Sequence, residues 1–256
     1  MNEESKRVVL ITGAGSGMGF RAVERFLLQG WSVAALDVNT DALDKLVSDG
    51  RLLILAVDVR SSEELAIAVQ KIEAGFGTID RVMHAAAIMP LGPLIDQSPS
   101  VIRNIMDINY QGLVNIVHAT LPGMLKRNCG EFVSFSSLVG AVPVRYMGAY
   151  AASKAAVSTF TEVLAEENFR SGIQFVCVCP PVVATPLLDQ ARDTMWPKVL
   201  DEAKPMAPDD ILDQVEKALK KGQFWLYPGP LLSTVYRCYQ LFTAGYEKWC
   251  QPCYGK

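Results

Sequence analysis

Residues 12–19 read Thr12-Gly13-Ala14-Gly15-Ser16-Gly17-Met18-Gly19 and separate an apolar run at 8–11 from a helical pattern over 17–29. Glycines at this spacing let a backbone turn tightly and come close to a ligand. The free N–H groups and the dipole at the start of a helix attract a pyrophosphate. The spacing is G-x3-G-x-G, which differs from the G-x-G-x-x-G fingerprint, and no Gly-Lys-Ser/Thr ending marks a nucleoside triphosphate loop. The stretch predicts a dinucleotide site, with an ordinary glycine-rich turn as the alternative.

Apolar runs and helical patterns alternate along the rest of the chain. Short apolar runs predict seven strands, at residues 8–11, 32–36, 52–57, 81–85, 132–135, 173–179 and 224–227. Helical patterns lie between them, at about 17–29, 40–48, 61–75, 99–126, 149–170 and 208–221. Strands that are apolar on both faces and separated by helices form parallel sheets covered on both sides. We therefore predict an α/β fold, with one doubly wound domain over residues 1–256 and a seven-stranded parallel sheet.

The composition excludes several functional classes. The chain has 256 residues, 50% of them hydrophobic and 20% charged, with a formal net charge of −3 and a mean hydropathy of +0.19. These values are typical of a folded domain and not of a disordered chain. No run of Lys or Arg exceeds two residues, no apolar stretch reaches the ~18–20 residues of a membrane span, and the polar N-terminus does not resemble a signal peptide. We expect a cytoplasmic protein without a transmembrane segment that binds no nucleic acid and no metal.

Acidic residues end the second and third predicted strands. Asp37 follows Gly19 by 18 residues, where a carboxylate accepts the ribose hydroxyls of NAD and repels the 2′-phosphate of NADP. Asp58 and Val59 end the third strand, where they would meet the adenine ring. We therefore expect NAD as the cofactor, although Asp37 taken alone would also suit a helix N-cap or a turn.

Tyr150 and Lys154 are four residues apart, which places a phenol and an ammonium on one face of a helix. A phenol with a pKa near ~10 exchanges protons poorly at neutral pH. A neighbouring ammonium and the positive charge of an oxidised nicotinamide favour the phenolate and lower that pKa. Ser137 follows the fifth predicted strand, so its hydroxyl can hold the substrate oxygen while Tyr150 moves the proton. Each residue type is common on surfaces, and only their joint spacing behind a dinucleotide loop favours catalysis.

Together these motifs resemble those of the short-chain dehydrogenase/reductase family, over about residues 7–228. Gly13, Gly17 and Gly19 match the family's T-G-x3-G-x-G loop, and Ser137, Tyr150 and Lys154 match its catalytic Ser and Y-x3-K. The resemblance implies a Rossmann-type fold and hydride transfer between NAD and an alcohol or ketone. It also implies that Asn109 holds a water in a proton relay and that Lys154 binds the nicotinamide ribose. The expected cofactor contacts are Gly13, Ser16, Gly17, Met18, Gly19, Asp37, Asp58, Val59, Ala85, Ala86, Tyr150, Lys154, Pro180, Val183 and Thr185.

The chain departs from the family pattern at two places before residue 228. His84-Ala85-Ala86-Ala87 replaces the usual N-N-A-G after the fourth predicted strand, and we expect His84 to be a hydrogen-bonding substitute for Asn rather than a catalyst. Pro181 stands where the family has Gly, which stiffens the turn beside the nicotinamide.

Residues 229–256 extend beyond the family pattern. An apolar stripe from Leu232 to Phe242 predicts a helix that caps the substrate pocket or a subunit interface of a homo-oligomer, a dimer or a tetramer. Attachment to a lipid surface is the alternative. Cys250 and Cys253 near the end are predicted to be inert, with a redox or metal role as the competing interpretation.

Apolar segments surround the predicted catalytic residues, at 89–91, 142–147 and in the long connection 186–207. Apolar walls with few polar anchors suit a lipophilic secondary alcohol or ketone, such as a steroid, a retinoid-like or a fatty substrate. Two alternatives stay open: a non-enzymatic dinucleotide-binding sensor or regulator on the same fold, and a 3-oxoacyl-type ketoreductase of lipid metabolism. The intact Ser137, Tyr150 and Lys154 oppose the sensor, and the acidic Asp37 opposes the ketoreductase, since such reductases generally prefer NADPH.

Overall fold

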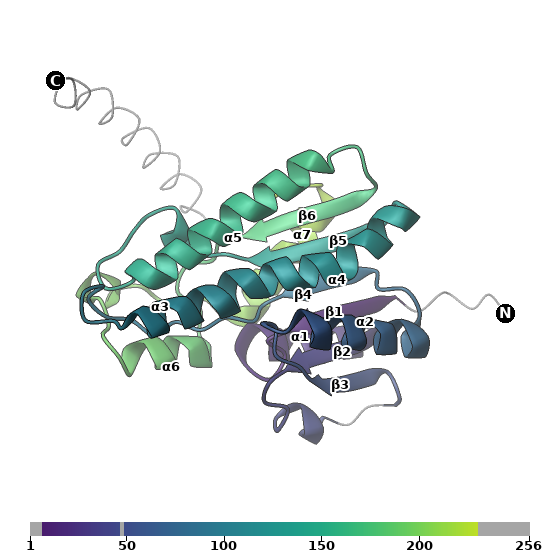
Figure 1. Ribbon diagram of the computed structural model, residues 1–256, viewed down its shortest axis with the longest axis horizontal. Coiled ribbons are helices and arrows are strands. Elements are labelled where there is room, and N and C mark those ends of the chain that lie inside the picture. The colour runs from purple at the N-terminus through teal and green to yellow at the C-terminus, as the bar shows by residue number, and fades with distance from the viewer. Residues whose placement is uncertain (1–6, 47–48, 230–256) are drawn as a thin grey trace.

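One parallel sheet of seven strands forms the centre of the computed structural model, which describes residues 7–46 and 49–229 (Figure 1). The strand order is β3-β2-β1-β4-β5-β6-β7, and every neighbouring pair is parallel. The strands are β1 (Val8–Thr12), β2 (Ser32–Asp37), β3 (Leu52–Ala56), β4 (Arg81–His84), β5 (Gly130–Phe135), β6 (Ile173–Val178) and β7 (Trp225–Leu226). The doubly wound, seven-stranded parallel sheet predicted from the sequence is confirmed.

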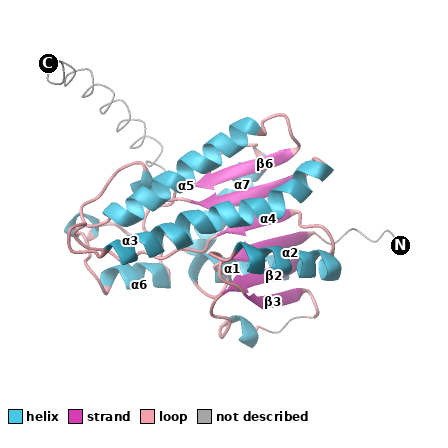
Figure 2. Ribbon diagram, viewed as in Figure 1, coloured by secondary structure: helices cyan, strands magenta, loops and turns pink. Residues whose placement is uncertain are grey.

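Helices cover both faces of the sheet (Figure 2). α2 (Ser62–Phe76), α4 (Gly112–Arg127) and α5 (Gly148–Glu167) pack on one face, and α1 (Gly17–Leu28) and α7 (Pro208–Lys220) pack on the other. α3 (Pro99–Met106) runs into α4 through a π-turn at Asp107–Gln111. α6 (Pro186–Arg192) lies in the connection between β6 and α7. None of the described helices is long and apolar enough to cross a membrane.

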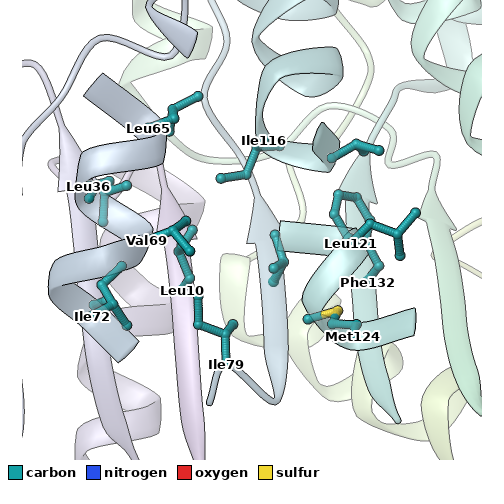
Figure 3. Close-up of a cluster of buried hydrophobic side chains, with 14 of the residues drawn as sticks. Leu10, Leu36, Leu65, Val69, Ile72, Ile79, Ile116, Leu121, Met124 and Phe132 are labelled. Carbon is teal, nitrogen blue, oxygen red and sulfur yellow. The ribbon is translucent and has the colours of Figure 1, made fainter. Parts of the chain in front are cut away.

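Two apolar cores follow from the alternation of side chains along each strand. In β1, Val8 and Leu10 point into the core under α2, α4 and α5, whereas Val9 and Ile11 point into the core under α1 and α7. Figure 3 shows the first of these cores, where Leu10 and Leu36 of the sheet meet Leu65 of α2. Because the central strands are buried on both sides, their sequences read as continuous apolar runs.

The helix predicted over 40–48 is wrong, because the described residues there form only a 3₁₀ turn at Leu43–Lys45. Side chains before it form local hydrogen bonds that compete with a helix, since Asn39 Oδ1 accepts the N–H of Asp41 at 2.9 Å. The helix predicted over 99–126 is confirmed, as α3, a π-helical segment and α4 follow one another without a break. The long connection 186–207 holds α6 and a 3₁₀ turn at Lys198–Leu200.

The order of the strands reverses between β1 and β4, because the chain continues from β1 to β2 on one side and from β4 to β5 on the other. A crevice for ligands forms at such a point, outside the carboxyl ends of the strands. Thr12 and His84 face each other there as the last residues of the two strands. The Thr12 Oγ1 lies 2.9 Å from the His84 Nδ1, and it also accepts the N–H of Ala86 at 3.4 Å.

His84 is buried and neutral. Burial is the main reason that its pKa falls to about 3, and the positive charge of Lys154 adds to this effect. Its Nε2 has no hydrogen-bond partner among the residues that the structure describes. The histidine therefore links β1 to β4 through Nδ1 alone, in line with the hydrogen-bonding role expected for it.

The depressed pKa of His84 makes acid destabilise the fold. The unfolded chain binds a proton on this imidazole below pH ~6.5, whereas the folded chain does so only near pH 3. Stability that is present above pH ~6.5 is therefore lost as the pH falls towards 3. Between pH 7 and pH 4.5 the free energy of unfolding of the wild type should fall because of this histidine. We predict that the fall is about 2 kcal/mol smaller in His84→Asn, which has no imidazole to protonate. Urea unfolding at both pH values measures this difference.

The exposed His118 provides the control for this experiment, and His118→Asn should leave the pH dependence as in the wild type. Parallel stability curves for the wild type and His84→Asn would contradict the assignment.

Candidate active site

A cavity of about 600 Å³ opens at the carboxyl ends of the strands. It brings the predicted dinucleotide residues and the predicted catalytic residues together in one space. The predicted site residues that line it are Gly13, Ser16, Gly17, Met18, Gly19, Asp37, Asp58, Val59, Ala85, Ala86, Ser137, Tyr150, Lys154, Pro180, Val183 and Thr185. Of the predicted site residues, Asn109 alone does not line this cavity.

The glycine-rich loop forms a backbone cradle at one end of the cavity. Gly13 has a φ of +66°, and a Cβ there would lie 2.6 Å from the backbone nitrogen of Ala86. A Cβ at Gly19 would lie 2.1 Å from the carbonyl oxygen of Gly13. Side chains at these two positions would therefore clash with the neighbouring backbone, and only glycine allows the loop to take this shape. Ser16 is the N-cap of α1, its hydroxyl caps no helical N–H, and the first turn has no acidic residue. This combination fits a pyrophosphate, since the helix dipole stays available to an anion.

Asp37 ends β2 at the rim of the cradle. Its carboxylate accepts the N–H of Gly15 at 2.8 Å and the N–H of Asn39 at 3.0 Å. These two bonds hold the carboxylate beside the glycine-rich loop, where the sequence predicts the adenosine ribose. The site fits the adenosine half of a dinucleotide.

Asp58 and Val59 line the cavity beyond Asp37, as expected for the adenine end. The carboxylate of Asp58 already has a partner, because Arg60 donates to both of its oxygens, at 3.0 and 2.9 Å from Nε. This hydrogen bonding is the main reason that the pKa of Asp58 lies below its ordinary value. Arg60 also lines the cavity and is anchored to Asn104 of α3 at 3.0 Å. Arg60 is not among the cofactor contacts predicted from the sequence. Its position two residues after Asp58 is the feature of the sequence that could have indicated it.

The opposite end of the cavity holds the predicted proton-transfer residues. Tyr150 and Lys154 lie one turn apart on α5, and both are buried. Ser137 is the N-cap of a 3₁₀ turn at Leu138–Gly140, directly after β5. Ser137 interacts with the phenol of Tyr150 and opposes the rise of its pKa. Ser137, Tyr150 and Lys154 line the same cavity.

Burial sets the protonation states of Tyr150 and Lys154. It raises the pKa of Tyr150 to about 12, although the interaction with Ser137 lowers it. It lowers the pKa of Lys154 to about 8, an effect that the thiols of Cys177 and Cys179 oppose. The Nζ of Lys154 donates to the carbonyl oxygen of Phe135 at 2.8 Å, which fixes the ammonium beneath the tyrosine. In the protein alone, the phenol keeps its proton at neutral pH.

Asn109 lies in the π-turn and supports the site from behind. Its Oδ1 accepts the N–H of Ile88 at 2.8 Å, and its Nδ2 donates to the carbonyl oxygen of Ile88 at 3.0 Å. The same Nδ2 donates to Ser153 Oγ at 2.9 Å, on the helical turn that joins Tyr150 to Lys154. The side chain thus braces α5 and the segment after β4. The predicted water-holding role of Asn109 stays a prediction.

Apolar side chains form the walls around Tyr150, as predicted from the sequence. We refer to this end of the cavity, where the sequence predicts that an alcohol or ketone binds, as the alcohol end. Some of the expected wall residues line the cavity, but Leu91, Val142, Val144, Tyr146 and Met195 do not. Leu91 and Val144 instead pack behind the wall, in the cluster that contains Tyr150. The expected residues that do line the cavity are Met89, Met147, Leu187, Leu188 and Trp196, together with Leu200 and Ala203 of the expected segment 186–207, and those missed include Ile88, Ile108, Leu138 and Val139.

The described residues contain no cluster of His, Cys, Asp or Glu that would hold a metal ion. Cys177 on β6 and Cys179 directly after that strand are buried, and neither lines the cavity. Cys250, Cys253 and the predicted helix of the C-terminal segment lie outside the described residues.

Comparisons of the chain with known proteins point to one family. A family model described as short chain dehydrogenase matches residues 7–196. The chain is 31% identical to the oxidoreductase UcpA of Salmonella typhimurium, over 86% of this chain and 82% of that protein. It is 32% identical to the 2,5-dichloro-2,5-cyclohexadiene-1,4-diol dehydrogenase of Sphingobium indicum, over 75% of this chain and 79% of that protein.

A solved structure supports the fold alone. The short-chain dehydrogenase/reductase of Burkholderia phymatum, in complex with NAD, superposes with a TM-score of 0.80 at 24% identity, over 93% of this chain and 94% of that one. The family match and the two relatives above 30% identity lead to one conclusion. The chain is an oxidoreductase that belongs to the short-chain dehydrogenase/reductase family.

Proposed function

We propose that the protein is an NAD(H)-dependent oxidoreductase that interconverts a lipophilic secondary alcohol and its ketone. The observation that carries the proposal is the joint cavity, in which a dinucleotide cradle ends beside Ser137, Tyr150 and Lys154. A sensor or regulator has no need of these three residues next to its cofactor. The observation therefore favours an enzyme over a binding protein.

Tyr150 is the proposed acid and base. In alcohol oxidation its phenolate takes the hydroxyl proton while the substrate carbon loses a hydride, and in ketone reduction the phenol returns that proton. Ser137 donates a hydrogen bond to the substrate oxygen and keeps it within reach of the tyrosine. Bound nicotinamide would accept or supply the hydride and, when oxidised, add a positive charge. Lys154, held by Phe135, favours the phenolate and is placed to bind the nicotinamide ribose.

Asp37 supports NAD rather than NADP. A fixed carboxylate can accept both ribose hydroxyls of NAD, whereas it repels a 2′-phosphate. The solved structure of the Burkholderia phymatum protein holds NAD, which agrees with this choice. The same carboxylate opposes the alternative of an NADPH-dependent 3-oxoacyl ketoreductase.

The walls of the alcohol end support a lipophilic substrate. Among the charged residues of the described chain, Lys154 and Lys204 line this end of the cavity, and apolar side chains form the rest of its walls. Such a surface stabilises apolar rings and chains and offers little to a polyhydroxylated sugar. The Sphingobium indicum relative is named for a chlorinated cyclic diol, which is a compound of this kind. We further propose a homo-oligomer, a dimer or a tetramer, to which the C-terminal segment contributes.

The proposed function predicts turnover of cyclic or fatty secondary alcohols with NAD and its loss in Tyr150→Phe. The variant keeps the ring and its packing but removes the proposed acid and base, so kcat should fall by ~10²–10⁴. Binding of NAD, measured by calorimetry, should stay close to that of the wild type. Lys154→Met should weaken both binding and turnover, because Lys154 has both proposed roles. Activity confined to small sugars or hydroxy acids, or a Tyr150→Phe variant with most of its activity, would contradict the proposal.

The cofactor choice predicts a change when the charge of Asp37 is removed. Asp37→Asn keeps an acceptor for the N–H of Gly15 but loses the negative charge, so the preference for NAD over NADP should narrow by about 2 kcal/mol, or ~30-fold. Asp37→Ala should narrow it at least as far. Values of kcat/KM with both cofactors measure the preference. Equal kcat/KM for NAD and NADP in the wild type would refute this choice.

A further inference from the structure

Residues 88–92 start in the wall of the cavity, which Ile88 and Met89 line, and continue behind it, where Leu91 packs. Two N–H groups of this segment donate to acceptors outside the connection that carries α6. The N–H of Ile88 donates to the Oδ1 of Asn109 at 2.8 Å. The N–H of Gly92 donates to the carbonyl oxygen of Tyr146 at 2.9 Å, just before α5 begins. Tyr146 has a left-handed φ of 70°, which is costly for a tyrosine and holds its carbonyl in this unusual direction.

The two remaining N–H groups of this segment are held by side chains of the connection that carries α6. The N–H of Met89 donates to the Oε1 of Gln190 at 2.6 Å, and the N–H of Leu91 donates to the Oγ1 of Thr194 at 3.0 Å. Position 90 is a proline and has no N–H to donate. Thr194 also donates to the carbonyl oxygen of Ala191 at 2.8 Å, so its hydroxyl is oriented to accept from Leu91.

These two bonds hold buried residues that share a hydrophobic cluster with the proposed catalytic tyrosine. Met89 and Leu91 are 8% and 6% exposed and pack in the same cluster as Met147 and Tyr150. An unpaired N–H in such surroundings is costly, and no other acceptor of the described chain bonds to either group. Gln190 and Thr194 themselves lie at the surface, so they can be replaced without opening the core.

The same connection starts at the cofactor end of the cavity. α6 begins directly after Thr185, and a Cβ at Gly17 would lie 3.1 Å from the Cβ of Thr185. The start of this connection therefore contacts the glycine-rich loop. Further along it, Gln190 and Thr194 accept hydrogen bonds from the backbone of residues 88–92. The connection joins the two ends of the cavity along one side.

We infer that Gln190 and Thr194 are positioning residues for substrate binding. By accepting the N–H groups of Met89 and Leu91, they seat α6 on residues 88–92 and hold Met89 in the cluster that contains Tyr150. The alcohol end is complete only when both bonds are made, so seating of α6 and assembly of the apolar wall are one event. The kinetic part of this inference rests on the proposed function, whereas the structural part does not.

Paired variants test the role of each bond. Gln190→Met and Thr194→Val keep the size of the side chains but remove the acceptors, whereas Gln190→Glu and Thr194→Ser keep an acceptor. Residue-resolved amide hydrogen exchange on the full chain without ligands reports each bond directly. We expect exchange of Met89 in Gln190→Met, and of Leu91 in Thr194→Val, to accelerate at least about fivefold. Ile88 and Gly92 should exchange as in the wild type, because their acceptors are untouched.

Kinetics then separates a positioning role from general support of the fold. In Gln190→Met and Thr194→Val, the KM for the alcohol should rise at least about fivefold while calorimetric binding of NAD changes less than about twofold. Gln190→Glu and Thr194→Ser should restore exchange and KM to within about twofold of the wild type. Unchanged exchange in the first pair, or a second pair as impaired as the first, overturns the inference. Absence of any alcohol turnover by the wild type would instead overturn the proposed function, and hydrogen exchange would still decide the role of the two bonds.

Discussion

The close contact between the ends of β1 and β4 is the constraint on which the rest of the site depends. Gly13 leaves β1 in a left-handed conformation, and the backbone of Ala86 leaves no room for a side chain there. Thr12 and His84 join the same strands just below, in the buried part of the sheet. The chain departs from this point in both directions, which opens the crevice between α1 and α5. The cradle, the carboxylate of Asp37 and the paired Tyr150 and Lys154 all border that crevice.

Burial gives the two ends of the cavity different chemistry. At the cradle, a helix with no acidic residue in its first turn offers fixed N–H groups to an anion. At the alcohol end, burial raises the pKa of Tyr150 to about 12 and lowers that of Lys154 to about 8, so the protein alone holds a protonated phenol. Under the proposed function, the positive charge of an oxidised nicotinamide beside Tyr150 would favour the phenolate and so let the residue accept a proton.

Much of this arrangement could be predicted because its signals are local in the sequence. The glycine spacing reports a turn that only glycine can make, and the step from Tyr150 to Lys154 reports one helical face. The alternation of apolar runs predicts the sheet, since parallel strands are buried on both sides. The contacts of Met89 with Gln190 and of Asn109 with Ile88 could not be predicted, because they join residues 101 and 21 positions apart through side chains of ordinary type. The helix predicted over residues 40–48 is wrong for a related reason. Local side-chain hydrogen bonds of Asn39 and Thr40 compete with helix formation there.

We expect the close contact of Gly13 with Ala86 to determine the shape of the cofactor crevice. The most direct test is calorimetric titration of NAD into the wild type, Gly13→Ala and Gly75→Ala, with circular dichroism to compare their folds. A Cβ at Gly75, within α2, meets no atom within 4 Å, so this variant controls for the loss of a glycine. The account predicts that Gly75→Ala binds NAD like the wild type and that Gly13→Ala binds it at least ~100-fold more weakly. A folded Gly13→Ala protein with the same dissociation constant as the wild type would contradict it.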